Sequence, residues 1–440
     1  MTLSRCKRSD LMTTQSLQQF FRALGPGLLF AGAAIGVSHL VQSTRAGALF
    51  GLGLVGVVLI ANLTKYPGLR FGSQYTQATG VSLLEGYRRQ GSWTLSIVAM
   101  LTLGSMFTVA AAVTLVTAAI FNELILSVLI SGASLQVGSI ILMALVALLL
   151  KTGGFKWLDR SIKLLLSAMG LLTFAATLSV LPQLDWSTLS FALPDHARDV
   201  ASITFVVALA GWMPAPMDIS IWNSIWCLAK RSETGRAATP EEDAVDFNVG
   251  FALCVFLALC FVILGTVVMH QAGQAPARGG VGMAKQILSL FTESLGAWSY
   301  PVVGASALAV MFSTTLTVLD AFPRVLVVLL DRFKGAEIEA EVARDLSKEP
   351  RYWMAFGLLI AGTLVVLFFF MKSFKQLVDL ATTLSFITTP VLAYFNHQAM
   401  FSSDVPEHLQ PKRPMRLFSI ACQALLVGFA LFYLWHRFGR

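Results

Sequence analysis

The stretch Gly211-Trp212-Met213-Pro214-Ala215-Pro216-Met217-Asp218 interrupts an apolar run that extends from Ile203 to Ala229. The run is long enough to cross a bilayer. Pro214 and Pro216 each lack a backbone N–H and clash with the preceding helical turn, so together they predict an opening near the middle of a helix. The backbone groups freed by this opening cannot face lipid and must face protein or a watery cavity.

Asp218 lies beside the predicted break and is the only carboxylate in the apolar run. A carboxylate at membrane depth is energetically costly and usually marks a substrate or ion pathway. The alternative is structural, with Asp218 capping the second half-helix by accepting its free N–H groups. The two interpretations are compatible, because a helix N-terminus is itself a ligand-binding feature.

The composition indicates a polytopic membrane protein. The 440 residues are 56% hydrophobic and 13% charged, and the mean hydropathy is +0.71. The apolar residues come in blocks of about 20, each sized for a bilayer. The formal net charge of +8 does not indicate nucleic-acid binding, because the basic residues lie between the apolar blocks. No phosphate loop, His-Glu-x-x-His motif or serine–histidine pair stands out, so we predict neither an enzyme nor a cofactor. The five cysteines show no metal-type spacing and are expected to be reduced or buried thiols.

About eleven membrane-spanning helices are predicted from the apolar blocks. Their approximate bounds are 25–46, 50–68, 93–120, 133–151, 160–181, 201–229, 247–270, 298–321, 352–371, 375–396 and 415–435. The excess of Lys and Arg in alternate connections places the N-terminus in the cytoplasm, and the expected location is the plasma (inner) membrane. The cytoplasmic segments include the ones that carry Lys65 and Arg70. Asp320 and Asp379 fall near predicted span ends, where contact with water is expected.

The first span carries a second interruption. Gly25-Pro26-Gly27 opens it, and its centre contains Gly36, Ser38, His39 and Gln42. Interrupted helices as the first and sixth spans indicate two successive five-span units, and such pairs mark transporters with inverted repeats and a midplane site. The predicted organisation is a cytoplasmic tail at 1–24, repeats at 25–181 and 201–396, and an eleventh helix with the C-terminal tail at 415–440.

Several motifs in the sequence resemble those of a known family. They are Gly25-Pro26-Gly27, Arg45-Ala46-Gly47-Ala48-Leu49-Phe50-Gly51, Tyr66-Pro67-Gly68-Leu69-Arg70-Phe71-Gly72, Thr79-Gly80-Val81-Ser82-Leu83-Leu84-Glu85-Gly86-Tyr87 and Ala215-Pro216-Met217-Asp218. The sequence resembles the NRAMP family of proton-coupled transporters of Mn²⁺, Fe²⁺ and related divalent metals. This resemblance implies an all-α membrane protein with a LeuT-type fold and unwound helices 1 and 6.

The departures from the family pattern fall on its functional positions. The family's first-span Asp-Pro-Gly-Asn corresponds to Gly36 through His39, so the metal-binding aspartate is Gly36 here. The sixth-span methionine corresponds to Ala215 and the histidine that follows to Met217, while the span-10 glutamine falls near Thr382. The resemblance therefore implies the scaffold and the position of the site rather than its ligands.

The substrate is expected between the two breaks. The residues predicted to contact it are Gly36, Ser38, His39, Gln42, Ala215, Met217, Asp218 and Thr382. Of these, His39, Met217 and Asp218 are the predicted metal ligands, since imidazole and thioether suit transition metals and a carboxylate suits harder ions. Met213 is expected to fill the core. The hydroxyls of Ser313, Thr314, Thr315 and Thr317 cluster in span 8, where LeuT-type folds can hold a coupling cation; bonding back to their own helix is the simpler interpretation.

The predicted function is secondary transport across the lipid bilayer in which the protein lies. The predicted substrate is a divalent metal ion, which would bind to site residues that differ from those of the family. Two alternatives stay open: transport of a small organic solute, and a non-transporting membrane sensor on the same scaffold. The missing aspartate favours a changed substrate or a sensor, whereas two broken helices with an acid beside one of them favour transport.

Overall fold

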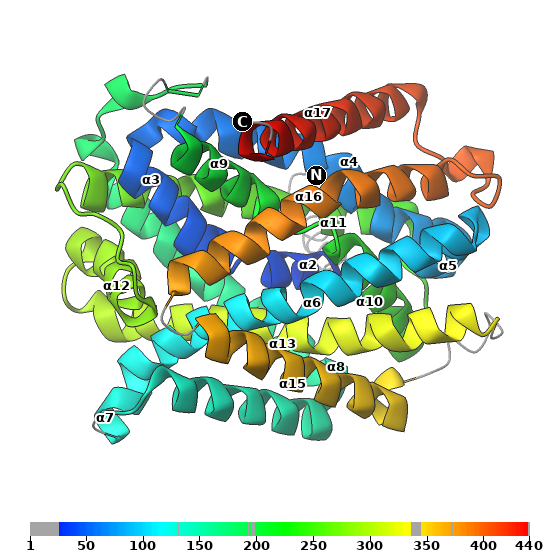
Figure 1. The fold of residues 1–440 in the computed structure, drawn as a ribbon, viewed down its shortest axis with the longest axis horizontal. Coiled ribbons are helices and arrows are strands. Elements are labelled where there is room, and N and C mark those ends of the chain that lie inside the picture. Colours follow the sequence, from blue (N-terminus) through cyan, green and yellow to red (C-terminus); the bar gives the residue numbers. More distant parts are fainter. Residues whose placement is uncertain are drawn as a thin grey trace, which may run out of the picture.

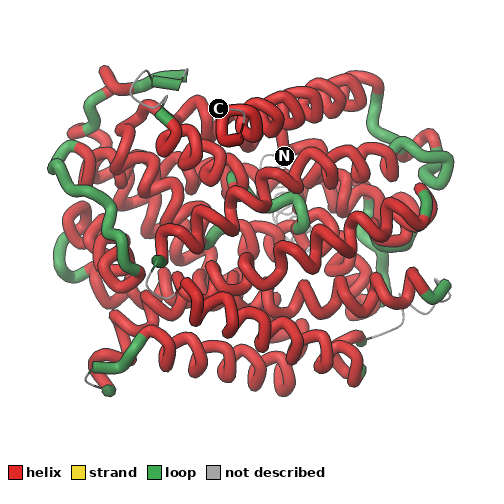
Figure 2. The backbone as a smooth tube through the Cα atoms, in the orientation of Figure 1, coloured by secondary structure: helices red, strands yellow, loops and turns green. Residues whose placement is uncertain are grey.

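The computed structural model describes residues 26–130, 132–191, 193–194, 199–335, 345–370 and 373–438. Within these ranges the chain is built from helices joined by loops, without strands (Figures 1 and 2). Nine of the described helical segments are long and apolar enough to cross a membrane. The prediction of an all-α membrane protein is confirmed.

The first span is broken, as predicted. Helix α2 (Pro26–Ala34) ends two residues before a π-helix, η1 (Val37–Ser43), which continues directly into α3 (Thr44–Phe50). The break is confined to Ile35 and Gly36. Helical hydrogen bonding resumes at Val37, so Ser38, His39 and Gln42 of the interrupted centre lie in the π-helix and not in the break.

The sixth span is broken over a longer stretch. Helix α9 (Val200–Trp212) and helix α10 (Ile219–Thr234) are separated by Met213 to Asp218, which the two prolines hold out of the helical conformation. Asp199 caps α9 by accepting hydrogen bonds from the N–H groups of Ala201 and Ser202.

The other long helices surround these two spans. They are α4 (Val55–Thr79), α6 (Ser92–Phe121), α8 (Leu135–Val180), α11 (Pro240–Leu264), α13 (Ser299–Phe333), α15 (Pro350–Phe370), α16 (Phe374–Met400) and α17 (Arg413–Phe438). Shorter elements join them: η2 (Gly51–Leu54), α5 (Leu83–Gln90), η3 (Asn122–Leu126), α7 (Ser127–Leu129), η4 (Leu181–Gln183), η5 (Trp186–Thr188), η7 (Gly265–His270), α12 (Gly280–Leu295), η8 (Leu346–Lys348) and η9 (Glu407–Leu409). Helix α6 packs against α13, α15 and α16, and Figure 1 shows these helices running along the long axis of the molecule.

Glycines allow the first span to pack closely against the seventh. A Cβ atom on Gly47 would lie 2.1 Å from the Val262 carbonyl oxygen, and one on Gly265 would lie 2.4 Å from the Thr44 carbonyl oxygen. A side chain at either position would therefore push the backbones apart, which is why small residues mark helix contacts in membranes. This packing fixes the position of the first break relative to α11.

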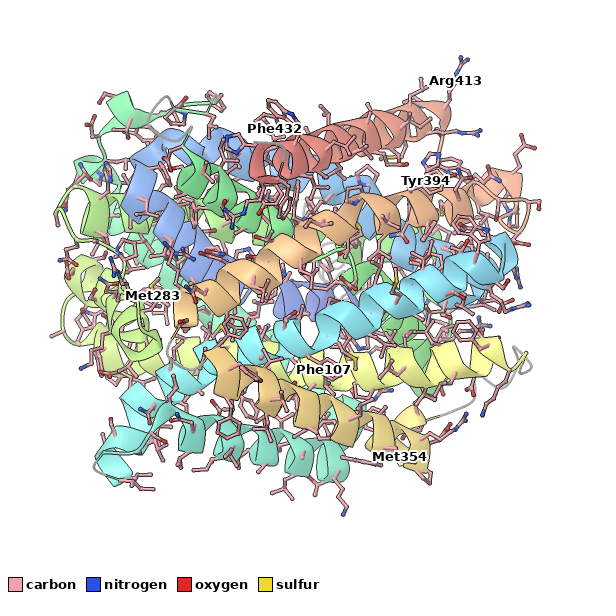
Figure 3. All side chains as sticks on the ribbon, in the orientation of Figure 1. Phe107, Met283, Met354, Tyr394, Arg413 and Phe432 are labelled. Carbon is pink, nitrogen blue, oxygen red and sulfur yellow. The ribbon has the colours of Figure 1, made fainter. Side chains whose placement is uncertain are left out.

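The outer surface is suited to lipid. Figure 3 shows side chains projecting from α15 and α17, where Met354 and Phe432 are labelled. Met354 is 73% exposed and Phe432 44% exposed. Large exposed apolar side chains on long helices match a bilayer, which supplies an apolar solvent on the outside.

Several predicted boundaries need correction. The spans expected at 133–151 and 160–181 lie in a single helix, α8. Helix α12 was missed because it is amphipathic, with Met283, Ile287 and Phe291 buried on one side, and its polar side conceals it from a search for apolar blocks. The charged segment from Asp331 to Tyr352 predicts a short solvated helix, and residues 336–344 of that segment lie outside the described residues.

Candidate substrate site

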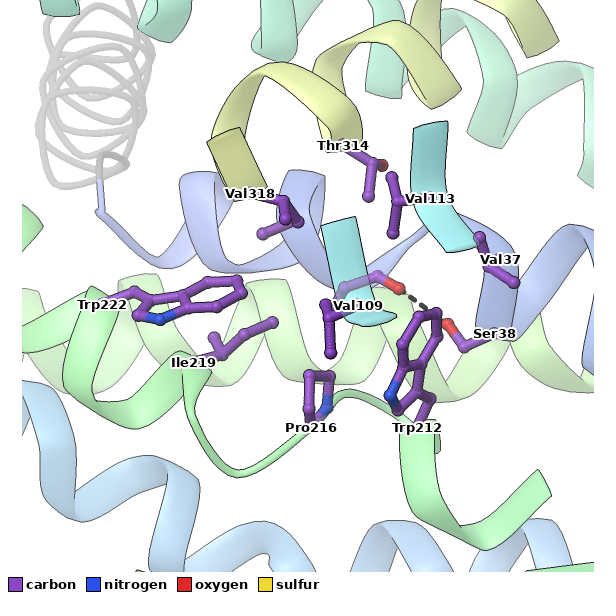
Figure 4. Close-up of a pocket in the computed structure, with 12 residues that line it drawn as sticks. Val37, Ser38, Val109, Val113, Trp212, Pro216, Ile219, Trp222, Thr314 and Val318 are labelled. Carbon is purple, nitrogen blue, oxygen red and sulfur yellow. Dashed lines mark hydrogen bonds between the residues drawn. The ribbon is translucent and has the colours of Figure 1, made fainter. Parts of the chain in front are cut away.

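A small cavity lies between the two breaks. It is lined by spans 1, 3, 6 and 8, which contribute Ala33, Ala34, Val37 and Ser38; Val109 and Val113; Trp212, Pro216, Ile219 and Trp222; and Thr314 and Val318 (Figure 4). About 20 Å³ is open to the centre of a water-sized sphere, which is enough for about one water molecule. A substrate larger than a water molecule therefore requires the walls of this cavity to move apart.

The cavity wall is apolar and aromatic. In Figure 4 the Trp212 indole stands beside Ser38, and Trp222 borders the other side with Ile219. The hydroxyls of Ser38 and Thr314 are its polar side-chain groups. Across the described part of the chain, no group of three or more His, Cys, Asp or Glu residues is arranged to hold a metal ion.

Ser38 connects the two breaks. Its Oγ lies 2.7 Å from the Ala34 carbonyl oxygen and 3.4 Å from the Pro214 carbonyl oxygen. The side chain is 3% exposed. Of the predicted site residues, Ser38 is the one whose side chain lines the cavity while contacting span 6.

Gly36 lies in the break at a position where a side chain has no room. A Cβ atom there would be 2.8 Å from Oγ1 of Thr314. An aspartate at this position, as in the NRAMP pattern, would collide with α13 unless Thr314 moved. The tight contact between spans 1 and 8 at Thr314 therefore explains why position 36 is a glycine.

His39 points toward span 7. Its Nε2 lies 2.9 Å from the Cys254 carbonyl oxygen, and its Nδ1 lies 2.7 Å from Ser38 Oγ. Because a carbonyl can only accept, Nε2 carries the hydrogen in this pair. Both ring nitrogens are occupied by protein atoms, so a metal at His39 would require one of these contacts to be released.

Gln42 and Thr382 belong to a polar cluster that joins span 1 to span 10. Gln42 Nε2 lies 3.4 Å from Thr382 Oγ1, and Arg45 Nη1 donates to both Gln42 Oε1 and Asp379 Oδ1 at 2.7 Å. Arg45 is 4% exposed. The expectation that Asp379 meets water is wrong in part, because Asp379 forms an ion pair with the buried Arg45.

Asp320 also departs from expectation. It is fully buried and pairs with Arg324 Nε at 2.7 Å and with the Tyr352 hydroxyl at 2.8 Å. The sequence placed Asp320 at the end of a span, but α13 continues to Phe333. The longer helix carries Asp320 into the interior, where its charge is matched by a partner one turn away.

Met217 and Asp218 lie on the side of span 6 that faces α4. A Cβ atom on Gly68 of α4 would be 2.9 Å from Sδ of Met217. Asp218 is 4% exposed and makes no capping hydrogen bond to α10. The capping alternative for Asp218 is therefore excluded in this conformation. Met213 is fully buried, as expected of a core residue.

Lys65 of α4 reaches into the sixth-span break. Its Nζ donates to the carbonyl oxygens of Gly211 at 2.6 Å and of Ala215 at 3.0 Å. It is 1% exposed and interacts electrostatically with Asp218. The prediction that Lys65 belongs to a cytoplasmic connection is wrong, because α4 continues to Thr79 and places Lys65 near its middle.

The predicted residues thus divide among several surroundings. Ser38 lines the cavity, His39 turns to α11, Gln42 and Thr382 meet at α16, and Ala215, Met217 and Asp218 face α4. The sequence motifs did not single out Trp212, Trp222 or Lys65 as site residues, and they gave Thr314 only as one hydroxyl of the span-8 cluster. The sequence did contain a signal that Lys65 lies inside a helix, because mostly apolar residues continue for a further helical turn after it.

A separate ionic cluster lies near α5. The buried Glu85 carboxylate accepts hydrogen bonds from Arg88 at 2.7 and 2.8 Å, from Arg89 at 3.0 Å and from Arg332 of α13 at 3.2 Å. Burial alone raises the pKa of Glu85, but the three arginines outweigh it and hold the pKa below the ordinary value of 4.5. The cluster ties α5 to α13 at this end of the molecule.

The first and sixth spans are each broken into two half-helices, and the breaks meet at a cavity. This arrangement defines a class of membrane transport protein, the LeuT-type fold. The chain belongs to the Nramp family, since the model for natural resistance-associated macrophage protein-like sequences matches residues 27–436. The uncharacterized protein PM0681 of Pasteurella multocida is 33% identical over 379 residues, which cover 86% of this chain and 84% of that protein.

Other similar proteins are more distant. The divalent metal cation transporter MntH of Verminephrobacter eiseniae is 25% identical over 280 residues, covering 61% of this chain and 62% of that one. Among solved structures, a mutant of the Eremococcus coleocola manganese transporter superposes with a TM-score of 0.65 at 14% identity, covering 93% of this chain and 85% of that chain. MhsT in complex with L-phenylalanine superposes with a TM-score of 0.61 at 13% identity, covering 93% and 97%. These structures confirm the LeuT-type fold.

Proposed function

We propose that the protein is a secondary transporter whose substrate binds in the cavity between the two breaks. Membership of the Nramp family supports this proposal. The polar cluster of Gln42, Arg45 and Asp379 closes one approach, and the cluster around Glu85 ties α5 to α13 elsewhere in the molecule. Transport follows if these contacts open in turn while the site between the broken helices stays in place.

The cavity favours a small organic solute with an apolar part. The observation that carries this conclusion is the pair of tryptophans, Trp212 and Trp222, that border the cavity. Aromatic and aliphatic walls with a few polar groups are typical of sites for small molecules. The Ser38 and Thr314 hydroxyls supply hydrogen-bonding groups that would orient the solute.

A divalent metal ion is the second candidate substrate. It is supported by the likeness to the divalent metal cation transporter of Verminephrobacter eiseniae and by Asp218 and Met217 at the break. Against it stand two observations on this chain. The Lys65 ammonium lies beside Asp218 and repels a second cation. The cavity wall offers no carboxylate, imidazole or thioether, the ligands that divalent ions prefer.

The proposed setting is the plasma (inner) membrane with a cytoplasmic N-terminus. The alternation of basic segments supports this orientation. The N-terminal tail itself lies outside the described residues. The multi-pass membrane character does not depend on the orientation, because it follows from the nine apolar helices of the described part.

Uptake into proteoliposomes distinguishes the two substrates. Labelled Mn²⁺ and a panel of small amino, carboxylic and heterocyclic solutes are offered to vesicles that contain the wild-type protein. We expect saturable uptake of one class of organic solute and no uptake of Mn²⁺. Replacing Trp222 with Ala should reduce solute uptake at least about tenfold, as expected for the loss of a buried aromatic contact.

The matched control is Trp435→Ala, because Trp435 is 59% exposed on α17. It should transport like the wild type. Saturable Mn²⁺ uptake that is lost in Asp218→Asn would contradict the organic-solute proposal and establish the metal instead. Absence of uptake for every compound would support the sensor alternative.

A further inference from the structure

A second and larger pocket lies between α4, α9, α16 and α17. About 230 Å³ of it is open to the centre of a water-sized sphere, against about 20 Å³ in the cavity between the breaks. Within the described chain the two share no lining residue. Helix α17 lies at the edge of the molecule and packs beside α16 (Figure 1). The pocket is therefore a site separate from the candidate substrate site.

The pocket follows one face of α4. This helix contributes Val57, Ile60, Ala61, Thr64 and Lys65 to the lining. Their spacing of three and four residues places them on the same side of the helix. Val57 and Lys65 are eight residues apart, which corresponds to about 12 Å along the helix axis. The pocket therefore runs along the direction of a membrane span for about two helical turns.

The exposure of the lining residues shows where the pocket opens. Ile60 and Leu425 are 54% and 60% exposed, whereas Val206, Phe386 and Lys65 are at most 3% exposed. Helices α4 and α17 belong to segments long and apolar enough to cross a membrane, so their exposed apolar side chains face the hydrocarbon of the bilayer. The pocket therefore has its mouth at the lipid-facing surface and its floor in the protein interior.

The polar groups of the lining are already bonded within the protein. Thr64 Oγ1 donates to the Ile60 carbonyl oxygen at 2.8 Å, and the Lys65 ammonium donates to the sixth-span break. The other lining residues are apolar. A polar ligand would lose its water here without replacement, whereas apolar cavities stay dry and accept apolar ligands. The chemistry of the walls therefore selects an apolar occupant.

We propose that this pocket binds one acyl chain of a membrane phospholipid. The mouth opens into hydrocarbon, where acyl chains are the apolar groups at hand, and the pocket extends along the span as such chains do. A chain in the pocket restores contacts that its walls lack when it is empty. The site does not depend on the proposed substrate, because it lies outside the cavity between the breaks.

A bound chain would support the sixth-span break from the lipid side. On α9 it contacts Val206 and Ala210, directly before Gly211, whose carbonyl oxygen accepts a hydrogen bond from Lys65. On α4 it contacts Lys65 itself. The chain therefore fills the space beside the contact that holds the half-helix α9 against α4.

Photolabelling tests the site on the full-length protein in lipid nanodiscs. The nanodiscs contain a phospholipid with a diazirine in one acyl chain, and labelled residues are mapped by mass spectrometry after irradiation. We expect label on the buried Val206 and Phe386 that saturates with the fraction of labelled lipid and is displaced by unlabelled phospholipid. Phe369 of α15 is 83% exposed and reports contact with bulk lipid, so its label should rise in proportion to that fraction.

A variant that fills the pocket locates the chain. Ala61→Phe should lower the label on Val206 and Phe386 at least about tenfold, the effect of keeping two methylene groups out of an apolar site. Ala144→Phe is the matched control, because Ala144 is exposed on α8 and does not line the pocket. It should be labelled like the wild type, and both variants should keep the label on Phe369.

Three results would overturn the proposal. The first is a wild-type protein labelled only at exposed residues, and the second is an Ala61→Phe protein labelled at Val206 and Phe386 like the wild type. The third is label displaced by a free fatty acid and not by phospholipid, which would make the free acid the occupant. If Ala61→Phe fails to fold, the wild-type contrast between Val206 and Phe369 decides. Because uptake is not measured, the result stands whether or not the protein transports a solute.

Discussion

The two broken helices expose the same kind of backbone group and satisfy it differently. In the sixth span, the carbonyls of Gly211 and Ala215 receive the ammonium of Lys65, a cation tethered to α4. In the first span, the carbonyls of Gly32 and Ile35 receive a single neutral hydroxyl from Thr314. One break therefore carries a cationic side chain, and the other meets a neutral hydroxyl group.

This difference offers a physical reason for the predicted replacement of the family's metal ligands. The Lys65 ammonium interacts electrostatically with Asp218 and opposes the approach of a divalent ion to that acid. The glycine at position 36 leaves room for Thr314, which an aspartate would displace. The changes at both breaks are consistent with a site rebuilt for another substrate.

The largest effect is expected from removing the tethered cation. Lys65→Met leaves two carbonyls and the Asp218 carboxylate buried without their partner, and should cost about 3–5 kcal/mol of unfolding free energy. Denaturant unfolding in detergent measures the loss. Asp218→Asn in the same chain should recover part of it. Lys348→Met, at a side chain that is 82% exposed, should change nothing; a Lys65→Met protein as stable as this control would refute the role of the ammonium.

Crowding the first break should have the next largest effect. In Gly36→Ala the new methyl group lies 2.8 Å from Thr314 Oγ1, so the hydroxyl must move. We expect a loss of about 1–3 kcal/mol of unfolding free energy from overpacking, measured by denaturant unfolding in detergent. Gly428→Ala is the control, since a Cβ there meets no atom within 4 Å. Equal stability of the two variants would contradict the tight contact between Gly36 and Thr314.

The ion pair of Arg45 and Asp379 should have a smaller effect on stability. Arg45→Gln leaves Asp379 without its charged partner and should cost about 2 kcal/mol of unfolding free energy, measured by denaturant unfolding in detergent. Lys285→Gln is the control, as its 3.8 Å pair with Glu123 is largely exposed on the lysine side. An Arg45→Gln protein as stable as this control would show that the buried pair adds nothing to stability.

The smallest effect concerns pH at the Glu85 cluster. The folded pKa of Glu85 lies below its ordinary value of 4.5, so its contribution to stability is present above that value and is lost as pH falls through the folded pKa. Between about pH 7 and pH 5.5, the stability gap between wild type and Glu85→Gln should stay constant. Thermal unfolding across this range checks it. A gap that narrows within the range would mean that the arginines do not hold the carboxylate ionised.

The sequence predicted the parts of the fold that local chemistry determines. Two prolines in an apolar run were sufficient to predict the break at Met213 to Asp218, and the small, polar centre of the first span predicted the break at Gly36. Helix α12 was missed because it is amphipathic, and a search for continuous apolar blocks does not distinguish an amphipathic helix from a loop between spans.

The site was predicted less well, because it depends on contacts between distant segments. The position of Lys65 in the chain gives no indication that its ammonium reaches Gly211, 146 residues away. His39 was expected at the midplane, and its orientation toward Cys254 is set by the packing of span 1 on span 7. Thr314 was noted as one hydroxyl among several, and only the fold brings it to the carbonyls of the first break.

Uptake of labelled solutes into proteoliposomes tests the account's central claim most directly. The account predicts saturable uptake of one class of organic solute and no uptake of Mn²⁺ by the wild-type protein, the same result for Trp435→Ala, and at least about tenfold lower solute uptake for Trp222→Ala. The account would be contradicted by saturable Mn²⁺ uptake that is lost in Asp218→Asn.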